Sequence, residues 1–233
     1  PQTVLDAYQG FSERYPSSDR LDYVLVRVAE SAVNGAAEGV GSPGTALQEF
    51  NHAIEFAPNG PVLDRALFGS SLILKGDGHS DEALLRLERL IAERPLSTLV
   101  PESRYQLANL HLEAGRPRKA ARELEKLLRG GALSRSSDEV RLRLILAYRE
   151  IDAYQELAPV ARELTLSDDA DAAALGARYL AAAYLHLREP GKAATILETE
   201  LATRPDAKDA DSLAIRRAEI LFGINRPDLV TAF

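Results

Sequence analysis

The chain has 233 residues, of which 45% are hydrophobic and 27% charged, and its formal net charge is −7. It contains no cysteine, which excludes disulfides, thiol nucleophiles and cysteine-ligated zinc. Nucleic acid is not expected as the main ligand, because arginines alternate with Glu and Asp instead of forming a concentrated basic stripe. No apolar run is long enough to span a membrane.

Small and apolar residues recur along the chain with a period near 37. Ala46, Ala83 and Ala120 are 37 residues apart, and the series continues in steps of 37, 36 and 37. A second apolar series follows four positions later, and prolines follow three of the small residues. A fixed period of this kind indicates a repeat array. The further members are Leu157, Ala193 and Val230 in the first series, Phe50, Leu87, Leu124, Ala161 and Leu197 in the second, and the prolines Pro58, Pro95 and Pro205.

In chain order, we expect one array over residues 1–233, built from helix pairs. Residues 1–16 form the second helix of a truncated repeat, and 208–233 form a partial repeat. The full units are 19–58, 62–95, 98–131, 138–169 and 174–205. Because the chain starts and stops inside predicted helices, we expect it to be a piece of a longer protein.

The unit 98–131 shows the pattern most clearly. Pro101 can begin a helix, since its missing N–H would be unpaired in the first turn, and apolar residues at helical spacing follow it up to Ala114. Gly115 and Pro117 end this helix, and a second amphipathic run leads to Gly130 and Gly131, which would cap it. Each unit is therefore a helical hairpin that must stack on its neighbours to bury its apolar faces.

Similar turn residues recur in the other units. Gly76-Asp77-Gly78 separates the helices of 62–95, and Pro190-Gly191 separates those of 174–205. The unit 138–169 is the most degenerate, because Asp152 stands where a turn glycine is expected.

These units resemble tetratricopeptide repeats. In that family, a small residue of the first helix meets a small residue of the second; Ala108 with Ala120, Ala181 with Ala193, and Gly69 with Ala83 match these positions. The resemblance implies an all-α, right-handed superhelical solenoid of antiparallel helix pairs. The chain departs from the family in lacking Trp, and in carrying Ile145 and Leu157 at both small positions of one unit, which puts close helix approach there in doubt.

The resemblance also implies where a ligand binds, because the first helix of each pair lines the concave face in this family. Carried over to this chain, that face holds a protein or peptide ligand, with Tyr105 and Arg178 as the expected anchors. The paired Lys and Asn that capture C-terminal carboxylates in chaperone-binding members are missing. The predicted partner-binding residues are Tyr105, Asn109, Leu142, Leu146, Arg149, Arg178 and Ala182, and the face also includes Glu102, Leu112, Glu113, Glu139, Glu150, Leu175, Leu185 and His186.

Candidate chemistry elsewhere in the sequence is weak. The segment 39–44 is glycine-rich but lacks the Lys-Ser/Thr pair of a phosphate loop, so we interpret it as a connector. His79 with Asp77 and Asp81 makes a poor metal site, because it offers one imidazole in a short loop. Two Asp clusters, at 168–171 and 206–211, lack the Gly and Glu of a calcium loop and are expected to cap helices. We therefore expect no catalytic residue, no metal and no cofactor.

The sequence predicts a non-catalytic protein–protein interaction scaffold. Arg94-Pro95-Leu96-Ser97 and Tyr105-Gln106-Leu107-Ala108 resemble phrases of bacterial cell-envelope repeat proteins, the outer-membrane assembly lipoproteins and the Tol–Pal coordinators. This implies a periplasmic or outer-membrane-associated protein. Two alternatives remain open: a helical accessory region of a peptidoglycan-processing enzyme, and a peptide-sensing domain of a transcription regulator. The sequence leaves the oligomeric state open.

Overall fold

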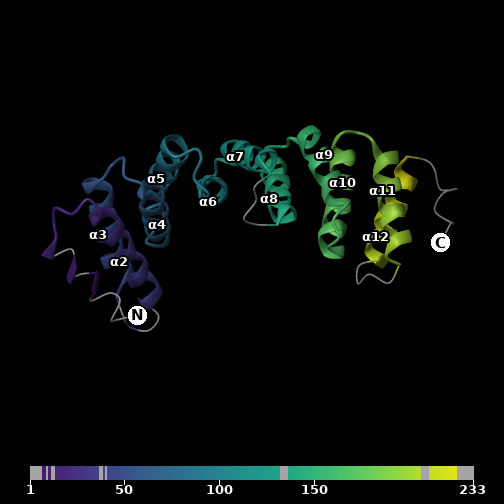
Figure 1. Ribbon diagram of the computed structural model, residues 1–233. Coiled ribbons are helices and arrows are strands. Elements are labelled where there is room, and N and C mark those ends of the chain that lie inside the picture. Colours follow the sequence, from purple (N-terminus) through teal and green to yellow (C-terminus); the bar gives the residue numbers. More distant parts are fainter. Residues whose placement is uncertain are drawn as a thin grey trace. The chain divides into compact units, whose positions relative to one another are not determined.

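The structure is a computed structural model that describes residues 7, 8, 10, 11, 14–36, 39, 41–131, 136–205 and 210–224. All regular structure within these residues is helical, so the all-α prediction is confirmed (Figure 1). The helices are α2 (Leu21–Gly35), α3 (Pro43–Phe56), α4 (Leu63–Gly76), α5 (Ser80–Glu93), α6 (Val100–Glu113), α7 (Pro117–Gly130), α8 (Ser137–Glu150), α9 (Tyr154–Leu164), α10 (Ala170–His186), α11 (Pro190–Thr203) and α12 (Ala210–Gly223).

The chain divides into two compact units, Pro1–Leu110 and His111–Phe233. In the first unit, α2 packs against α3, α3 against α4, and α4 against α5. In the second, each helix from α7 to α12 packs against the next in chain order. The helix pairs predicted for 19–58, 62–95, 138–169 and 174–205 are therefore present, whereas the predicted unit 98–131 is divided between the two compact units. Much of the predicted helix 1–16, together with 206–209 and 225–233, lies outside the described residues.

Both predicted apolar series lie in the helical cores. Their described members are Ala46, Ala83, Ala120, Leu157 and Ala193, then Phe50, Leu87, Leu124, Ala161 and Leu197, and none of these is more than 2% exposed. Val230 lies outside the described residues. The period in the sequence therefore reflects the core, because each hairpin buries a side chain at the same two positions.

The connectors between hairpins repeat one hydrogen-bond pattern. After α5, the amide of Arg94 donates to Leu90 O, that of Ser97 to Arg94 O, and that of Val100 to Ser97 O. The connector after α3 repeats these three bonds at residues 57, 60 and 63. Pro58 and Pro95 therefore stand at equivalent places, as the sequence predicted.

In the connectors after α5 and α9, a serine hydroxyl donates to an aspartate in the first turn of the preceding hairpin. Ser97 Oγ donates to Asp64 Oδ2 at 2.5 Å, and Ser167 Oγ donates to Asp138 Oδ2. At the corresponding place after α3, a Cβ on Gly60 would lie 2.5 Å from Asp22 Oδ2. We call the two serine–aspartate hydrogen bonds the connector contacts.

Four turns within hairpins each hold one residue in the left-handed backbone region. Gly78 and Gly115 have φ values of 83° and 64°, and Asp152 and Arg188 have values of 55° and 62°. Asp152 thus replaces the turn glycine as predicted. In 174–205 the turn residue is Arg188, because Pro190 and Gly191 already belong to α11.

A close helix approach lies next to the degenerate unit, between its second helix α9 and the following helix α10. Ile145 and Leu157 are fully buried. A Cβ on Gly176 of α10 would lie 2.7 Å from Thr165 N and 2.8 Å from Leu164 C, so glycine lets α10 approach the end of α9. No described helix is both long and apolar enough to cross a lipid bilayer.

Candidate functional site

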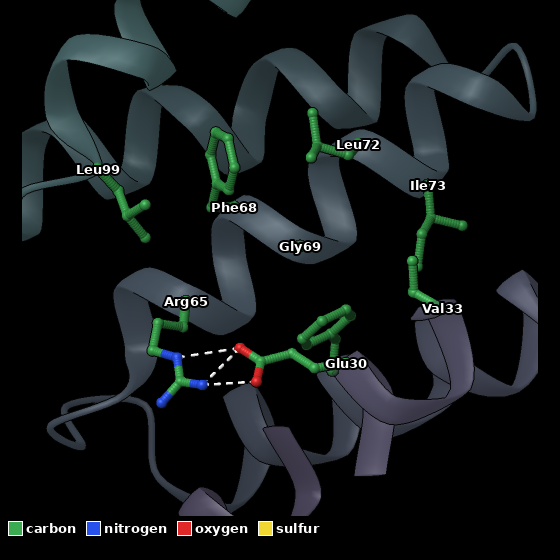
Figure 2. Close-up of a pocket in the computed structure, with 9 residues that line it drawn as sticks. Glu30, Val33, Arg65, Phe68, Gly69, Leu72, Ile73 and Leu99 are labelled. Atoms are coloured by element: carbon green, nitrogen blue, oxygen red, sulfur yellow. Dashed lines mark hydrogen bonds and ion pairs between the residues drawn. The ribbon is translucent and has the colours of Figure 1, made fainter. Parts of the chain in front are cut away.

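An apolar pocket opens between α2 and α4 in the first unit (Figure 2). Residues 65, 68, 69, 72 and 73 of α4 line it, and this spacing places them along one face of the helix. Glu30 and Val33 of α2 face them, Phe50 of α3 lines the pocket as well, and Leu99 comes from the connector before α6. The pocket is therefore built by two neighbouring first helices and the second helix that joins them.

Gly69 determines the shape of this pocket. A Cβ at Gly69 would lie 2.3 Å from Cζ of Phe50, so the missing side chain leaves room for the phenyl ring. Phe50 is itself only 2% exposed and cannot move far within the core. The sequence analysis paired Gly69 with Ala83 of the following helix. In the structure, the atoms nearest to a Cβ at Gly69 belong to Phe50 of the preceding helix α3.

Two apolar side chains at the pocket remain open to solvent. Val33 is 43% exposed and Leu72 is 41% exposed, and Phe68 and Leu99 are half-buried. The pocket has a volume of about 270 Å³. Sites for drug-sized molecules usually have roughly 300–1,000 Å³. The pocket is therefore suited to an apolar side chain rather than a large cofactor.

An ion pair closes one end of the pocket. Arg65 Nε donates to Glu30 Oε1 at 3.0 Å, and Arg65 Nη2 lies 2.6 and 2.5 Å from the two carboxylate oxygens (Figure 2). Arg27 Nη1 reaches the same carboxylate at 3.1 Å, and Arg65 Cζ lies 6.0 Å from the centroid of the Tyr23 ring. Glu30 and Arg65 are thus held in place, and they give the pocket a polar end opposite Val33 and Ile73.

The sequence-predicted residues of α8 and α10 lie in the second unit. Leu142 and Leu146 are half-buried, while Arg149, Arg178 and Ala182 are exposed. Leu142 lines a pocket of about 300 Å³ together with Glu139 and Leu175.

Two ring contacts lie near this region of the second unit. Arg149 Cζ lies 5.7 Å from the ring centroid of Tyr179, and the rings of Tyr154 and His186 stack at 3.9 Å. Leu142 of α8 and Leu175 of α10 therefore line one pocket, and Arg149 of α8 lies near Tyr179 of α10.

Tyr105 of α6 does not lie where a ligand anchor would. Its side chain is only 2% exposed, and Asn109 beside it is half-buried. A tyrosine on the apolar face of a helix is buried because its ring contributes a large apolar area. The structure therefore does not support Tyr105 as a solvent-facing anchor.

The pocket between α2 and α4 was missed in the sequence because binding positions were carried over only to residues 102–186. The sequence did contain one signal for the pocket. Phe68, Leu72 and Ile73 lie close to Gly69 in the sequence, and together they are more apolar residues than the buried face of one helix requires, so some of them were available to line a pocket.

Other candidate sites carry no evident chemistry. The described residues contain no group of three or more His, Asp or Glu side chains that could hold a metal ion. His79 Nδ1 instead lies 3.7 Å from Glu82 Oε1. In the glycine-rich connector, a Cβ on Gly41 would lie 2.7 Å from Ala32 Cα, so this glycine serves packing. Val40 and part of the cluster 206–211 lie outside the described residues.

No protein-family model and no curated protein sequence matches the chain. Among solved structures, YrrB, described as a TPR protein with an unusual peptide-binding site, is similar at 16% identity with a TM-score of 0.64, over 92% of this chain and 99% of that one. The C-terminal part of a TPR repeat-containing protein from Cytophaga hutchinsonii matches at 15% identity and 0.63, over 98% and 86%. MamA matches at 13% identity and 0.57, over 83% and 96%. The fold is therefore that of tetratricopeptide repeat proteins.

Proposed function

We propose that this chain is a protein-interaction scaffold that holds a segment of a partner protein, with one apolar side chain of that segment seated between α2 and α4. The observation that carries the proposal is the pairing of two exposed apolar side chains, Val33 and Leu72, over a pocket lined almost entirely by carbon. Burying one large apolar side chain contributes about 1.5–3 kcal/mol, which is enough to make it a binding hot spot.

We propose a separate set of partner contacts in the second unit, on α8 and α10, with Leu142, Leu146, Arg149, Arg178 and Ala182. Exposed guanidinium groups can bind a carboxylate or a main-chain carbonyl with two hydrogen bonds. The proposed scaffold needs no cofactor and performs no catalytic step. The structure of YrrB, with its reported peptide-binding site, supports peptide capture by this fold.

We propose a bacterial envelope assembly as the setting, on the strength of the repeat phrases around Pro95 and Tyr105. Cell fractionation of the source organism, followed by immunodetection, tests this setting separately. Recovery in the cytosolic fraction would contradict it without bearing on the pocket.

A matched pair of leucines tests the pocket itself. Leu72 lines the pocket and is 41% exposed, whereas Leu85 on α5 is 65% exposed and lines none of the described pockets. Peptides are selected from a random display library against the unaltered chain, and their affinities are then measured by fluorescence anisotropy. Leu72→Glu is expected to weaken binding at least tenfold, about 1.4 kcal/mol, because it places a charge over the apolar pocket. Leu85→Glu is expected to change binding by less than about twofold.

The selected peptides should share a large apolar residue. Peptides that bind Leu72→Glu and the unaltered chain equally well would place the contact elsewhere on the molecule.

A further inference from the structure

Helix α7 in the second unit carries a stripe of exposed cations. Arg118, Arg122, Lys126 and Arg129 are spaced by four, four and three residues and are all exposed. At about 100° per residue, these spacings place them within roughly 80° of one another, along about 16 Å of the helix. The opposite face, with Ala120, Leu124 and Leu127, is buried.

Only the C-terminal half of this stripe is neutralised. Lys126 Nζ lies 2.6 Å from Glu123 Oε1, and Arg129 Nη1 lies 3.4 Å from Glu125 Oε2. Within the part of the chain that the structure describes, no carboxylate pairs with Arg118, Lys119 or Arg122. The N-terminal half of α7 thus presents three cations without a counter-charge.

Glu125 also accepts a hydrogen bond from the neighbouring helix α8. The hydroxyl of Tyr148 donates to Glu125 Oε1 at 2.6 Å. Burial, followed by this hydrogen bond, raises the pKa of Tyr148 far above its ordinary value, so the phenol keeps its proton and remains a donor.

The arrangement is unfavourable for an isolated chain. Like charges four residues apart on a helix repel each other. The first turn of a helix also disfavours cations, because the dipole is positive there. Helices α4, α5, α8, α9 and α10 carry an acidic residue in the first turn, whereas α7, like α3 and α11, carries none. Exposed cations such as Arg118 and Arg122, which cost stability and pair with no carboxylate in the described part of the chain, are typical of a recognition surface.

We infer that the stripe Arg118, Lys119 and Arg122, extended by Lys126 and Arg129, is a second docking surface that binds an acidic segment of a protein partner. Arginine binds carboxylates with two parallel hydrogen bonds, and an acidic segment has the charge complementary to these cations. A membrane surface is disfavoured, because α7 has no large exposed apolar side chain to insert. A nucleic acid is disfavoured, because α7 has no aromatic side chain for stacking and interleaves two glutamates with its cations.

Fluorescence anisotropy with a labelled oligoglutamate peptide tests this surface, at a salt concentration low enough (about 50 mM) to preserve surface electrostatics. The variant is Arg118→Glu with Arg122→Glu. The matched control is Lys192→Glu with Arg216→Glu, which changes the charge of the second unit by the same amount at exposed cations of α11 and α12. The first variant is expected to weaken binding at least tenfold, and the control less than twofold. Circular dichroism checks that both variants fold.

Four results would overturn the inference. Equal weakening by both variants would show that only bulk charge matters. Failure of the unaltered chain to bind the peptide below about 1 mM would show that the surface has no affinity for acidic segments. Tighter binding of a single-stranded oligonucleotide of equal charge, lost in the first variant alone, would assign the surface to nucleic acid. Salt-sensitive self-association of the unaltered chain, lost in the first variant, would assign it to a second copy.

Discussion

The absence of a side chain at Gly69 is the residue-scale feature on which the pocket depends. Gly69→Ala is expected to destabilise the chain, because overpacking against the buried Phe50 ring costs about 1–3 kcal/mol. This exceeds the roughly 1 kcal/mol that alanine gains over glycine inside a helix. Urea unfolding followed by circular dichroism measures the change. Gly191→Ala is the control, since a Cβ there has no atom within 4 Å. A higher midpoint for Gly69→Ala would mean that Phe50 has room to move.

Arg118 gives a prediction of the opposite sign. Arg118→Glu places an anion in the first turn of α7 and removes one repulsion with Arg122, so it is expected to stabilise the chain by about 0.3–1 kcal/mol. The gain should shrink in molar salt, because screening weakens exposed charge interactions. Thermal unfolding at low and high salt measures both effects. A destabilised variant would show that Arg118 makes a favourable contact in the folded chain.

At this scale the sequence predicted which residues are buried, whereas the predicted binding residues stay a prediction. The small and apolar series fell in the core because periodicity reports which face a helix buries. Tyr105 was assigned to the groove by analogy of position, but its large ring is buried in this chain. The basic stripe of α7 was not predicted from the sequence. Its cations alternate with glutamates along the chain, and they share one face only once the helix is formed.

At the scale of elements, the turns within hairpins show a conserved geometry filled by different residues. The residue in the left-handed region is a glycine in two of these turns, at Gly78 and Gly115, but Asp152 and Arg188 in the other two. Sequence reasoning found the first three from glycine and aspartate chemistry. It placed the last turn at Pro190-Gly191, because a Pro-Gly pair normally signals a turn. Here Pro190 begins α11, where its fixed φ and missing N–H suit the first turn.

Arg188→Gly is therefore expected to stabilise the hairpin of α10 and α11. A non-glycine residue in the left-handed region costs about 1–2 kcal/mol, and the greater freedom of glycine in the unfolded chain offsets about 0.5–1 kcal/mol of that gain. The net gain should be about 0.5–1 kcal/mol, measured by chemical unfolding. Arg178→Gly, in the middle of α10, should instead lose about 1 kcal/mol. Equal losses in the two variants would show that the turn at 188 is not strained.

At the scale of the whole molecule, nearest-neighbour packing predicts local responses to mutation. In a repeat array each hairpin contacts only its neighbours. Leu87→Ala leaves a cavity in the core of the first unit and is expected to cost about 2–5 kcal/mol. Amide hydrogen exchange by mass spectrometry should show faster exchange in α4 and α5, with little change in α10 and α11. Uniformly faster exchange across α4 to α11 would mean that the chain unfolds as one cooperative block.

The fold class follows from the sequence because a period of helix pairs admits few architectures. The division at residue 110 could not be predicted, since α6 has the same period and turn chemistry as its neighbours. Charge divides unevenly across the same boundary. Residues 1–110 carry 9 cations and 15 anions, a net charge of 9 − 15 = −6, and the remaining residues account for −1 of the total of −7. The two units therefore offer partners different surfaces.

The connector contacts bear on how such a chain can change in length. Asp64 with Ser97, and Asp138 with Ser167, close different junctions with the same two side-chain types. A hairpin inserted or deleted between two such junctions would meet its neighbour through an aspartate and a serine that already fit each other. Exchange of hairpins between these two junctions therefore keeps the aspartate–serine hydrogen bond at the joint, whereas the helix faces packed beside it differ, as Gly69 against Phe50 and Gly176 against α9 show.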